Sequence, residues 1–270
     1  MKTFCVISNR DKDVNLNHAN HVKKYLESRG CACYIDSGDY GDIPVIREET
    51  EGVLVLGGDG TMLKAARDLA GYGLPLLGIN LGTVGYLTEV EIGSMENALD
   101  RVIRDEYHIE ERMMLEGRAK GTAMALNDIV VSRTGPLQMM SYNVYVNGQF
   151  LNGYQADGII VSTPTGSTGY NMSAGGPVVE PTASILVVTP ICPHTLNTRS
   201  IILSPADEIR IEVPEGRMGM KQMLLAYFDG GSDMVLETGD SLTIVRSKRT
   251  TKIMRLSQIS FLETLHKKLQ

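Results

Sequence analysis

One apolar run that leads directly into a glycine-rich turn constrains the fold of this chain most. Residues 53–56 read Val-Leu-Val-Leu, and residues 57–61 read Gly-Gly-Asp-Gly-Thr. A continuous apolar run is typical of a strand buried on both faces, as in parallel sheets that helices cover on either side. Residues 62–69 follow with helical character. We therefore expect a strand–turn–helix unit within an α/β sheet.

The same alternation of strand and helix extends over the first part of the chain. Gly30 ends an amphipathic stretch, as a C-terminal glycine commonly does, and Ser94 is suited to begin another as its N-cap. Such alternation predicts a parallel sheet with helices on its faces. The expected strands are 3–8, 32–35, 52–56 and 75–79, and the expected helices are 17–29, 62–69 and 94–104.

After residue 108 the pattern changes to short, turn-punctuated β-prone runs with almost no helical periodicity. Asn147-Gly148 predicts a two-residue hairpin turn. Residues 257–269 return to a helix, in which Ile259, Leu262 and Leu265 are expected to dock. The expected strands are 123–131, 142–146, 158–162, 185–189, 200–203, 208–213, 222–228 and 242–246.

These patterns predict an α/β plus mostly-β fold with two domains. The first, residues 1–107 and 249–270, is a parallel-sheet α/β domain that carries the glycine turn. The second, residues 108–248, is β-rich and β-sandwich-like. The C-terminal helix is expected to return to the first domain.

Composition narrows the classes of function. The 270 residues are 43% hydrophobic and 21% charged, as in globular proteins. The net charge of −6 argues against a nucleic-acid partner, which usually requires a basic face. No apolar run approaches about 20 residues, and the first residues do not resemble a signal peptide. We therefore expect a cytoplasmic protein without membrane partners.

The four cysteines indicate no metal site. Cys31 and Cys33 are two residues apart, but no second pair supplies the other ligands of a zinc site. The five histidines show no metal-ligand spacing, so no side chains are expected as metal ligands. Cys5, Cys192 and the other two are expected to be reduced, buried thiols. His194, in a turn after a strand, is either a functional residue or a structural hydrogen-bonding group.

The glycine turn is suited to bind phosphate. Glycines let backbone N–H groups approach an anion, and the start of the following helix presents free N–H groups to it. Gly58, Gly60 and Thr61 are the candidates for these contacts, and Lys64 lies one turn further on. Asp59 is out of place beside phosphates unless it accepts a substrate proton or helps to place Mg²⁺. The alternatives are a tight turn whose aspartate caps the helix, and an exposed helix lysine.

A second candidate region, residues 153–177, is dense in hydroxyls and glycines. Hydroxyls beside backbone amides suit ribose and phosphate oxygens, and a tyrosine can stack on a planar base. The alternative is a long solvated loop. The candidate binding residues in it are Asp157, Thr165, Thr168, Gly169, Tyr170, Asn171 and Ser173.

A third candidate is the Asn127-Asp128 pair at an apolar strand. Two adjacent polar side chains can bracket the cis diol of a ribose, which offers two donors and two acceptors. The alternative is an ordinary bulge or strand-start pair.

Together these motifs resemble the NAD kinase family over nearly the whole chain. Gly-Gly-Asp-Gly-Thr alone is also found in diacylglycerol and sphingosine kinases, whereas the Thr-Pro-Thr-Gly-Ser-Thr-Gly-Tyr block of residues 163–170 is far more specific. The similar segments are 57–61, 78–87, 127–128, 157–177 and 190–194.

The resemblance implies transfer of the γ-phosphoryl group of ATP to the 2′-hydroxyl of the adenosine ribose of NAD, with Mg²⁺, to give NADP. It implies that Asp59 accepts the proton, and that Asn127 and Asp128 contact the ribose and adenine end. Asp157 would lie near the nicotinamide half, and residues 168–173 would form the adenine-side wall. It also implies an α/β domain with a β-rich domain, in a homodimer or homotetramer.

This chain departs from the family pattern at several positions. Asp128 stands where many members have Glu, Tyr86 where Phe is common, and Gly169 where Ala is common. Gly230-Gly231 follows a late aspartate where a glutamine is frequent. The rival functions are a lipid kinase and a non-catalytic nucleotide-binding regulator. ATP against polyphosphate as donor, NAD against NADH as acceptor, and control by NADP stay open.

Overall fold

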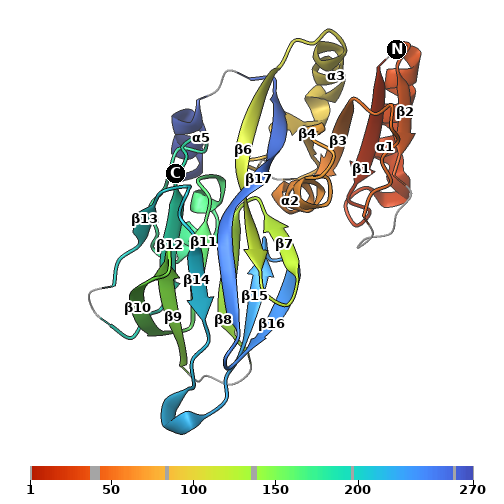
Figure 1. Ribbon diagram of the computed structural model, residues 1–270. Helices are drawn as coiled ribbons and strands as arrows, with labels where there is room; N and C mark the ends of the chain where they lie inside the picture. The colour runs from red at the N-terminus through yellow and green to blue at the C-terminus, as the bar shows by residue number, and fades with distance from the viewer. Residues whose placement is uncertain are drawn as a thin grey trace. The chain divides into compact units, whose positions relative to one another are not determined.

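The computed structural model describes residues 2–36, 43–82, 85–134, 139–195, 198–257 and 260–269. The chain divides into two compact units, and each is described by itself. The first unit comprises residues 1–112 and 249–270, and the second comprises residues 113–248. Strands β6 (His108–Arg118) and β17 (Ser241–Arg255) have residues in both units (Figure 1).

The first unit contains the expected parallel sheet. Each neighbouring pair among its four main strands is parallel, and the end of β17 adds to β4 in the same direction. The short strand β5 (Val90–Glu91) also pairs with β4. In order across the sheet, the main strands are β2 (Ala32–Ile35), β1 (Thr3–Ser8), β3 (Gly52–Gly57) and β4 (Pro75–Asn80).

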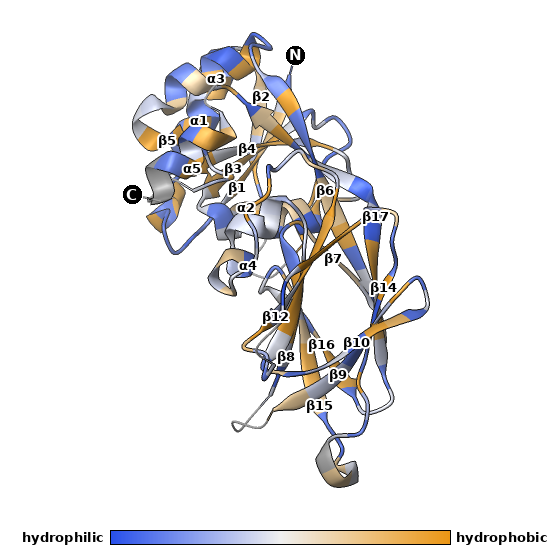
Figure 2. Cartoon of the chain, turned by 90° about the vertical axis from the view of Figure 1, so that its left-hand side faces the viewer, coloured by the Kyte–Doolittle hydropathy of each residue, from blue (hydrophilic) through white to orange (hydrophobic). Residues whose placement is uncertain are grey.

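Helices α1 (Asn17–Ser28) and α3 (Met95–Ile103) cover one face of this sheet. Val22 of α1 and Leu99 of α3 are fully buried in one cluster with Leu54 of β3. Figure 2 shows both helices with hydrophilic as well as hydrophobic residues, as expected of helices with one buried side. Short 3₁₀ turns precede them at Val14–Leu16 and Ile92–Ser94.

Two helices depart from the sequence predictions. Helix α2 (Asp59–Asp68) begins three residues before the expected start, so Asp59 lies in its first turn. The C-terminal helix α5 (Phe261–Leu269) is shorter than predicted. Leu262 is 71% exposed, so the expectation that it docks is wrong. The same expectation for Ile259 falls outside the described residues.

The second unit is built from two β-sheets. One is six-stranded and antiparallel, and the other includes β17 and β6 beside further strands. The six, in order, are β13 (Ile201–Leu203), β12 (Leu186–Ile191), β11 (Gly158–Ser162), β8 (Asp128–Arg133), β15 (Met223–Phe228) and β16 (Ser232–Glu237). The further strands are β10 (Gln149–Ala156), β9 (Met140–Val146), β14 (Ile209–Glu212) and β7 (Thr122–Ala125).

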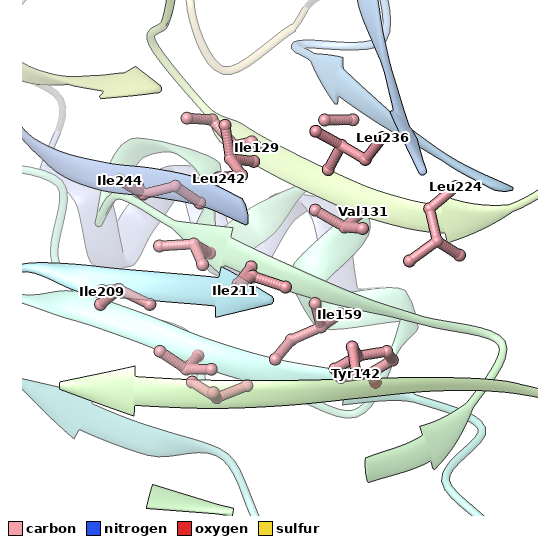
Figure 3. Close-up of a cluster of buried hydrophobic side chains, with 14 of the residues drawn as sticks. Ile129, Val131, Tyr142, Ile159, Ile209, Ile211, Leu224, Leu236, Leu242 and Ile244 are labelled. Atoms are coloured by element: carbon pink, nitrogen blue, oxygen red, sulfur yellow. The ribbon is translucent and has the colours of Figure 1, made fainter. Parts of the chain in front are cut away.

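The core of this unit lies between the two sheets. Ile129 and Ile159 of the six-stranded sheet share one buried cluster with Ile211 of β14, and Figure 3 shows such side chains between the strands. Tyr142 is also buried there, and its hydroxyl donates to the Gly158 carbonyl at 2.5 Å. The expected β-sandwich-like second domain is therefore confirmed.

Two turns of this unit test the strand predictions, and one prediction is confirmed while the other is wrong. Asn147 and Gly148 join β9 to β10 with φ angles of +50° and +78°, as the hairpin prediction requires. The single strand predicted over 123–131 is instead two strands, β7 and β8, interrupted at Leu126 and Asn127. Strands β6 and β16 were not predicted.

The cysteines are all free thiols, and Cys5, Cys31 and Cys33 are buried as expected. Cys192 is exposed, so the expectation of a buried thiol is wrong there. Burial raises the pKa of the Cys5 thiol to about 11 and that of Cys33 to about 12. In the part of the chain that the structure describes, no helix is long and apolar enough to cross a membrane.

Candidate active site

The glycine turn between β3 and α2 is fixed from both sides. Gly57 ends β3 opposite Asn80 of β4, and its carbonyl accepts the Leu81 N–H at 2.9 Å. A Cβ on Gly57 would lie 2.3 Å from Thr61 Oγ1, so only glycine fits beside that threonine. Thr61 Oγ1 in turn accepts the Asn9 side-chain amide at 3.3 Å. The first turn of α2 is therefore anchored to strands on either side.

The Asp59 carboxylate is bound to the segment that follows β4. Its Oδ2 accepts the Tyr86 N–H at 2.7 Å, and its Oδ1 accepts the Leu87 N–H at 3.0 Å. The N–H and hydroxyl of Thr88 both reach Oδ1 at 3.3 Å. A Cβ on Gly85 would lie 1.8 Å from Oδ1, so the backbone can approach the carboxylate only at glycine.

These contacts argue against the helix-capping interpretation of Asp59. Gly58 occupies the N-cap position, with no side-chain cap bond, and the bonds that Asp59 accepts come from residues 86–88 rather than from α2. A capping aspartate would instead accept the N–H groups of its own helix. Among the described residues Oδ1 accepts three hydrogen bonds, whereas Oδ2, which can accept at least two, accepts one. It therefore retains capacity to accept one from a substrate hydroxyl.

The two other candidates of the first unit have partners in the structure. The Lys64 ammonium lies 2.5 Å from Asp68, one turn along α2, so binding a phosphate there would compete with this ion pair. Tyr86 is half-buried, and its pKa is raised by burial and by the negative charge of Asp59. Thr83 and Val84 of the 78–87 motif lie outside the described residues.

An ionic network supports the segment that holds Asp59. Arg255 donates to the Tyr86 carbonyl at 3.2 Å and to the Glu110 carboxylate at 2.7 Å. Arg112 pairs with Glu110 on its other side at 2.8 Å. Burial alone would raise the pKa of Glu110, but its hydrogen bonds with Arg112 and Arg255 lower it. The segment is thus tied to the ends of β6 and β17 that belong to the first unit.

In the second unit, the segments that carry candidate site residues adjoin three neighbouring strands at one end of the six-stranded sheet. Ser162 at the end of β11 lies opposite Asp128 at the start of β8, and Phe228 at the end of β15 lies opposite Ile129. The hydroxyl-rich segment after β11, the turn before β8 and the turn after β15 therefore meet at this end.

Asp229, directly after β15, holds the turn before β8. Its carboxylate accepts three N–H groups, from Leu126 at 2.9 Å, Asn127 at 2.7 Å and Asp128 at 3.2 Å. Sequence reasoning did not single out this residue as part of the site. The local signal for it is weak, namely an aspartate between an apolar strand and Gly230-Gly231.

Asn127 has its backbone fixed and its side-chain acceptor available. Its carbonyl accepts the Thr163 N–H at 2.9 Å, and a Cβ on Gly166 would lie only 2.2 Å from that carbonyl oxygen. Its Oδ1 is buried and has no hydrogen-bond partner among the described residues. An unsatisfied buried acceptor in a polar turn is suited to bind a ligand donor.

Asp128 is a buried carboxyl with a shifted pKa. It is 6% exposed, and burial, with the negative charge of Asp229 beside it, raises its pKa to about 7. Near neutral pH it is therefore present in both forms and can donate or accept a hydrogen bond.

The segment after β11 divides into buried supports and accessible groups. Thr165 and Asn171 are buried. The Asn171 amide donates to the carbonyls of Ser167 and Pro177 at 3.2 and 3.0 Å, and its Oδ1 accepts from Thr189 at 2.7 Å. Tyr170 is 48% exposed in the short helix α4 (Tyr170–Ser173), which follows the 3₁₀ turn Thr165–Thr168. Ser173 is exposed, and Thr168 and Gly169 are half-buried.

Asp157 lies away from this group. It precedes β11, whereas the hydroxyl-rich segment follows the same strand, so the whole strand, roughly 13 Å long, lies between them. Its carboxylate pairs with Arg133 at 3.0 Å. The backbone N–H of His194 donates to the Gln155 carbonyl nearby at 2.9 Å. The structure thus brings Asn127, Asp128 and residues 165–173 together, but not Asp157.

These features define a class of protein: an α/β unit with an amide-rich glycine–aspartate turn, and a β-sandwich unit with a polar, hydroxyl-rich end. Comparison with known families identifies it further. A family model described as ATP-NAD kinase N-terminal domain matches residues 41–107, and one described as ATP-NAD kinase C-terminal domain matches residues 126–256.

Curated relatives match over the full length. The NAD kinase of Agathobacter rectalis is 44% identical over 100% of this chain and 99% of its own. That of Lachnospira eligens is 42% identical over 100% of both chains. The chain therefore belongs to the NAD kinase family.

Solved structures share the fold at lower identity. Yeast NADH kinase, solved with NADH, has a TM-score of 0.85 at 22% identity, over 100% of this chain and 87% of that one. An Archaeoglobus fulgidus NAD kinase, solved with ATP, has a TM-score of 0.80 at 24% identity, over 95% of this chain and 94% of that one.

Proposed function

We propose that this chain transfers the γ-phosphoryl group of ATP to the 2′-hydroxyl of the adenosine ribose of NAD, giving NADP and ADP. The observation that carries the proposal is the Asp59 carboxylate. Backbone amides of residues 86–88 orient it at the start of α2, and its Oδ2 retains capacity to accept a hydrogen bond. The names of the full-length relatives support the same reaction.

In the proposed mechanism, Asp59 accepts the proton of the 2′-hydroxyl while the ribose oxygen bonds to the γ-phosphorus. The bond from that phosphorus to the bridging oxygen of ADP breaks in the same step. Gly58 and Gly60 bind the donor phosphates through their backbone N–H groups, and Thr61 does so through its hydroxyl, because the Thr61 N–H donates to the Gly58 carbonyl at 3.0 Å. Catalysis is then mostly positioning and charge stabilisation, as in other phosphoryl transfers.

Mg²⁺ fits this site as a companion of the donor phosphates. The described residues contain no group of three or more acidic, histidine or cysteine side chains that could hold a metal on their own. Mg²⁺ is commonly bound by one or two carboxylates together with substrate phosphates, so Asp59 is the side chain that would share it. When bound, the ion would neutralise charge on the transferring phosphates.

The second unit supplies the proposed acceptor site. The Oδ1 of Asn127, which has no partner among the described residues, and the carboxyl of Asp128 would bind ribose hydroxyls. Thr168, Gly169, Tyr170 and Ser173 form the accessible adenine-side wall, which the buried Thr165 and Asn171 support from within. Asp157, at the other end of β11, would contact the nicotinamide half. We also propose that the chain forms a homodimer or homotetramer and acts in the cytoplasm.

A coupled assay for NADP formation tests this function. Purified protein is given NAD or NADH with ATP or polyphosphate, and diacylglycerol and a sphingoid base serve as alternative acceptors. We expect NADP to form from NAD and ATP in a Mg²⁺-dependent reaction, without lipid phosphorylation. Phosphorylated lipid, or no product with any nucleotide acceptor, would contradict the proposal.

A further inference from the structure

The loop that follows β1 is anchored against the glycine turn. The Asn9 N–H donates to the Leu56 carbonyl at 2.9 Å, and its side-chain amide reaches Thr61 Oγ1 at 3.3 Å. The carbonyl and side-chain oxygens of Asn9 both accept the Lys12 N–H, at 3.1 and 3.3 Å. This loop therefore places Lys12 beside the start of α2, although Lys12 is far from the turn in sequence.

The Lys12 ammonium lies over two glycines of this region. Its Nζ is 3.5 Å from the position that a Cβ would take on Gly58, and 3.6 Å from that position on Gly82. Gly58 is the N-cap of α2, a ten-residue helix whose first N–H groups are free to bind an anion. Lys12 is exposed, and within the described ranges no residue accepts a hydrogen bond from its amino group.

Asn80 provides an independent sign of a ligand at the same place. It is the last residue of β4, lies opposite Gly57 and is 3% exposed. Its Oδ1 accepts the Gly82 N–H at 2.9 Å, so its amide faces the loop that Lys12 also approaches. Its Nδ2 is buried and has no hydrogen-bond partner anywhere in the described chain. Leaving a buried donor unpaired is unfavourable, and a ligand acceptor would remove this cost.

We propose that Lys12 and Asn80 bind the phosphate chain of the donor over the start of α2. Lys12 supplies an exposed cation from the β1 loop, Asn80 a buried N–H donor, and Gly58 and Gly82 leave room for the anion between them. This inference rests on the proposed kinase function for the identity of the donor. The recognised chemistry is a polyanionic phosphate chain, which a nucleoside triphosphate and an inorganic polyphosphate share.

Calorimetric titration with inorganic tripolyphosphate, in the presence of Mg²⁺, tests the phosphate site without turnover. We expect Lys12→Met to weaken binding at least tenfold and Lys12→Arg to recover part of it. Lys23→Met is the matched control, because Lys23 is a half-buried α1 lysine whose partner, 3.9 Å away, is Glu27. It should bind as the wild type does. Equal binding by Lys12→Met and wild type, or no binding by wild type, would overturn the proposal.

The Asn80→Asp variant tests the buried donor separately. It keeps the oxygen that accepts the Gly82 N–H and replaces the amide donor with a negatively charged acceptor. We expect tripolyphosphate binding to fall at least tenfold while NAD affinity changes less than threefold, and the NAD measurement reports that the variant is folded. Unchanged tripolyphosphate binding with NAD affinity retained would remove Asn80 from the site.

Repeating the titrations with ATP distinguishes the sources of the phosphate chain. The same loss in Lys12→Met with ATP as with tripolyphosphate is expected if both use the site. Wild-type protein that binds tripolyphosphate but forms no NADP would contradict the proposed function and leave the phosphate site standing. If the wild-type protein forms NADP and Lys12→Met has an unchanged KM for ATP, the phosphate site is contradicted and the proposed function is left standing.

Discussion

At the scale of single residues, Asp229 controls where two proposed ribose-binding groups lie. Its carboxylate accepts the N–H groups of Leu126, Asn127 and Asp128, which are about a hundred residues earlier in the chain. Hydrogen bonds to a charged, largely buried acceptor contribute about 1.5–3 kcal/mol each to stability. Asp229 is therefore a positioning residue, because it acts through the turn.

We expect Asp229→Asn to lower the free energy of unfolding by about 2 kcal/mol, because one acceptor oxygen becomes a donor that faces other donors. The KM for NAD should rise more than the KM for ATP. Urea unfolding and steady-state kinetics measure the two effects. Asp233→Asn, on an exposed position of β16, is the control and should change neither.

Asp128 predicts a dependence of stability on pH. Burial and the charge of Asp229 raise its pKa from 3.8 to about 7 in the folded protein. Between about pH 4 and pH 7 the folded state holds a proton that the unfolded state has lost, so stability falls as pH rises, by up to roughly 1.4 kcal/mol per unit. Below and above this window the contribution is constant.

Asp128→Asn should remove this dependence. Urea unfolding at pH 5, 6, 7 and 8 should show the variant gaining on the wild type from pH 5 to pH 7 and no further by pH 8. A difference between the two proteins that stays constant from pH 5 to pH 7 would show that the carboxyl titrates normally.

At the scale of elements, the close approach of the hydroxyl-rich segment to the turn before β8 depends on a glycine. A Cβ on Gly166 would lie 2.2 Å from the Asn127 carbonyl oxygen, which is backbone and cannot move aside. Gly169 is the matched control, since its nearest neighbour would be 3.3 Å from a Cβ.

We expect Gly166→Ala to lower the free energy of unfolding by about 3 kcal/mol and to weaken NAD binding at least tenfold, because the segment must move away from Asn127. Gly169→Ala should unfold within about 0.5 kcal/mol of the wild type. Thermal or urea unfolding with NAD titration distinguishes the two. Equal stability of both variants would show that the segment is not closely packed.

The elements that the sequence predicts well have local causes. The apolar run at 53–56 and the Asn147-Gly148 turn specify β3 and the β9–β10 hairpin from their own residues. For the break between β7 and β8 the sequence offered only the alternative of a bulge or strand-start pair at Asn127-Asp128, because the carboxylate that holds this turn belongs to Asp229, about a hundred residues later. Strand β6 was missed since charged residues interrupt its alternation. One of them, Glu110, is matched by Arg112 and by the distant Arg255.

Some residues of the candidate site were likewise visible in the sequence, and others were not. The glycine turn and the 163–170 block were visible because each is continuous in sequence. Lys12 was not visible, and Asn80 and Asp229 were noted only as parts of the family pattern, since the significance of all three comes from contacts between segments distant in sequence. Asn171, by contrast, was predicted from its motif to be a binding residue. It lies in the interior, and its side-chain amide is already hydrogen-bonded.

At the scale of the whole molecule, the two units present different functional groups. The first presents an oriented carboxylate and free amides beside the start of a helix. The second presents an unpaired amide oxygen, a carboxyl with a pKa near neutrality and an exposed aromatic ring. Phosphoryl transfer requires both a donor site and an acceptor site, so neither unit is expected to catalyse it alone.

The Asp59→Asn variant tests the central claim most directly. Its rate of NADP formation and its affinity for NAD are measured side by side, with thermal unfolding as the check on folding. Loss of a general base costs about 10²–10⁴-fold in rate, so we predict a fall of that size in kcat with NAD affinity within threefold of the wild type. A folded variant that forms NADP at a near-normal rate would contradict the account.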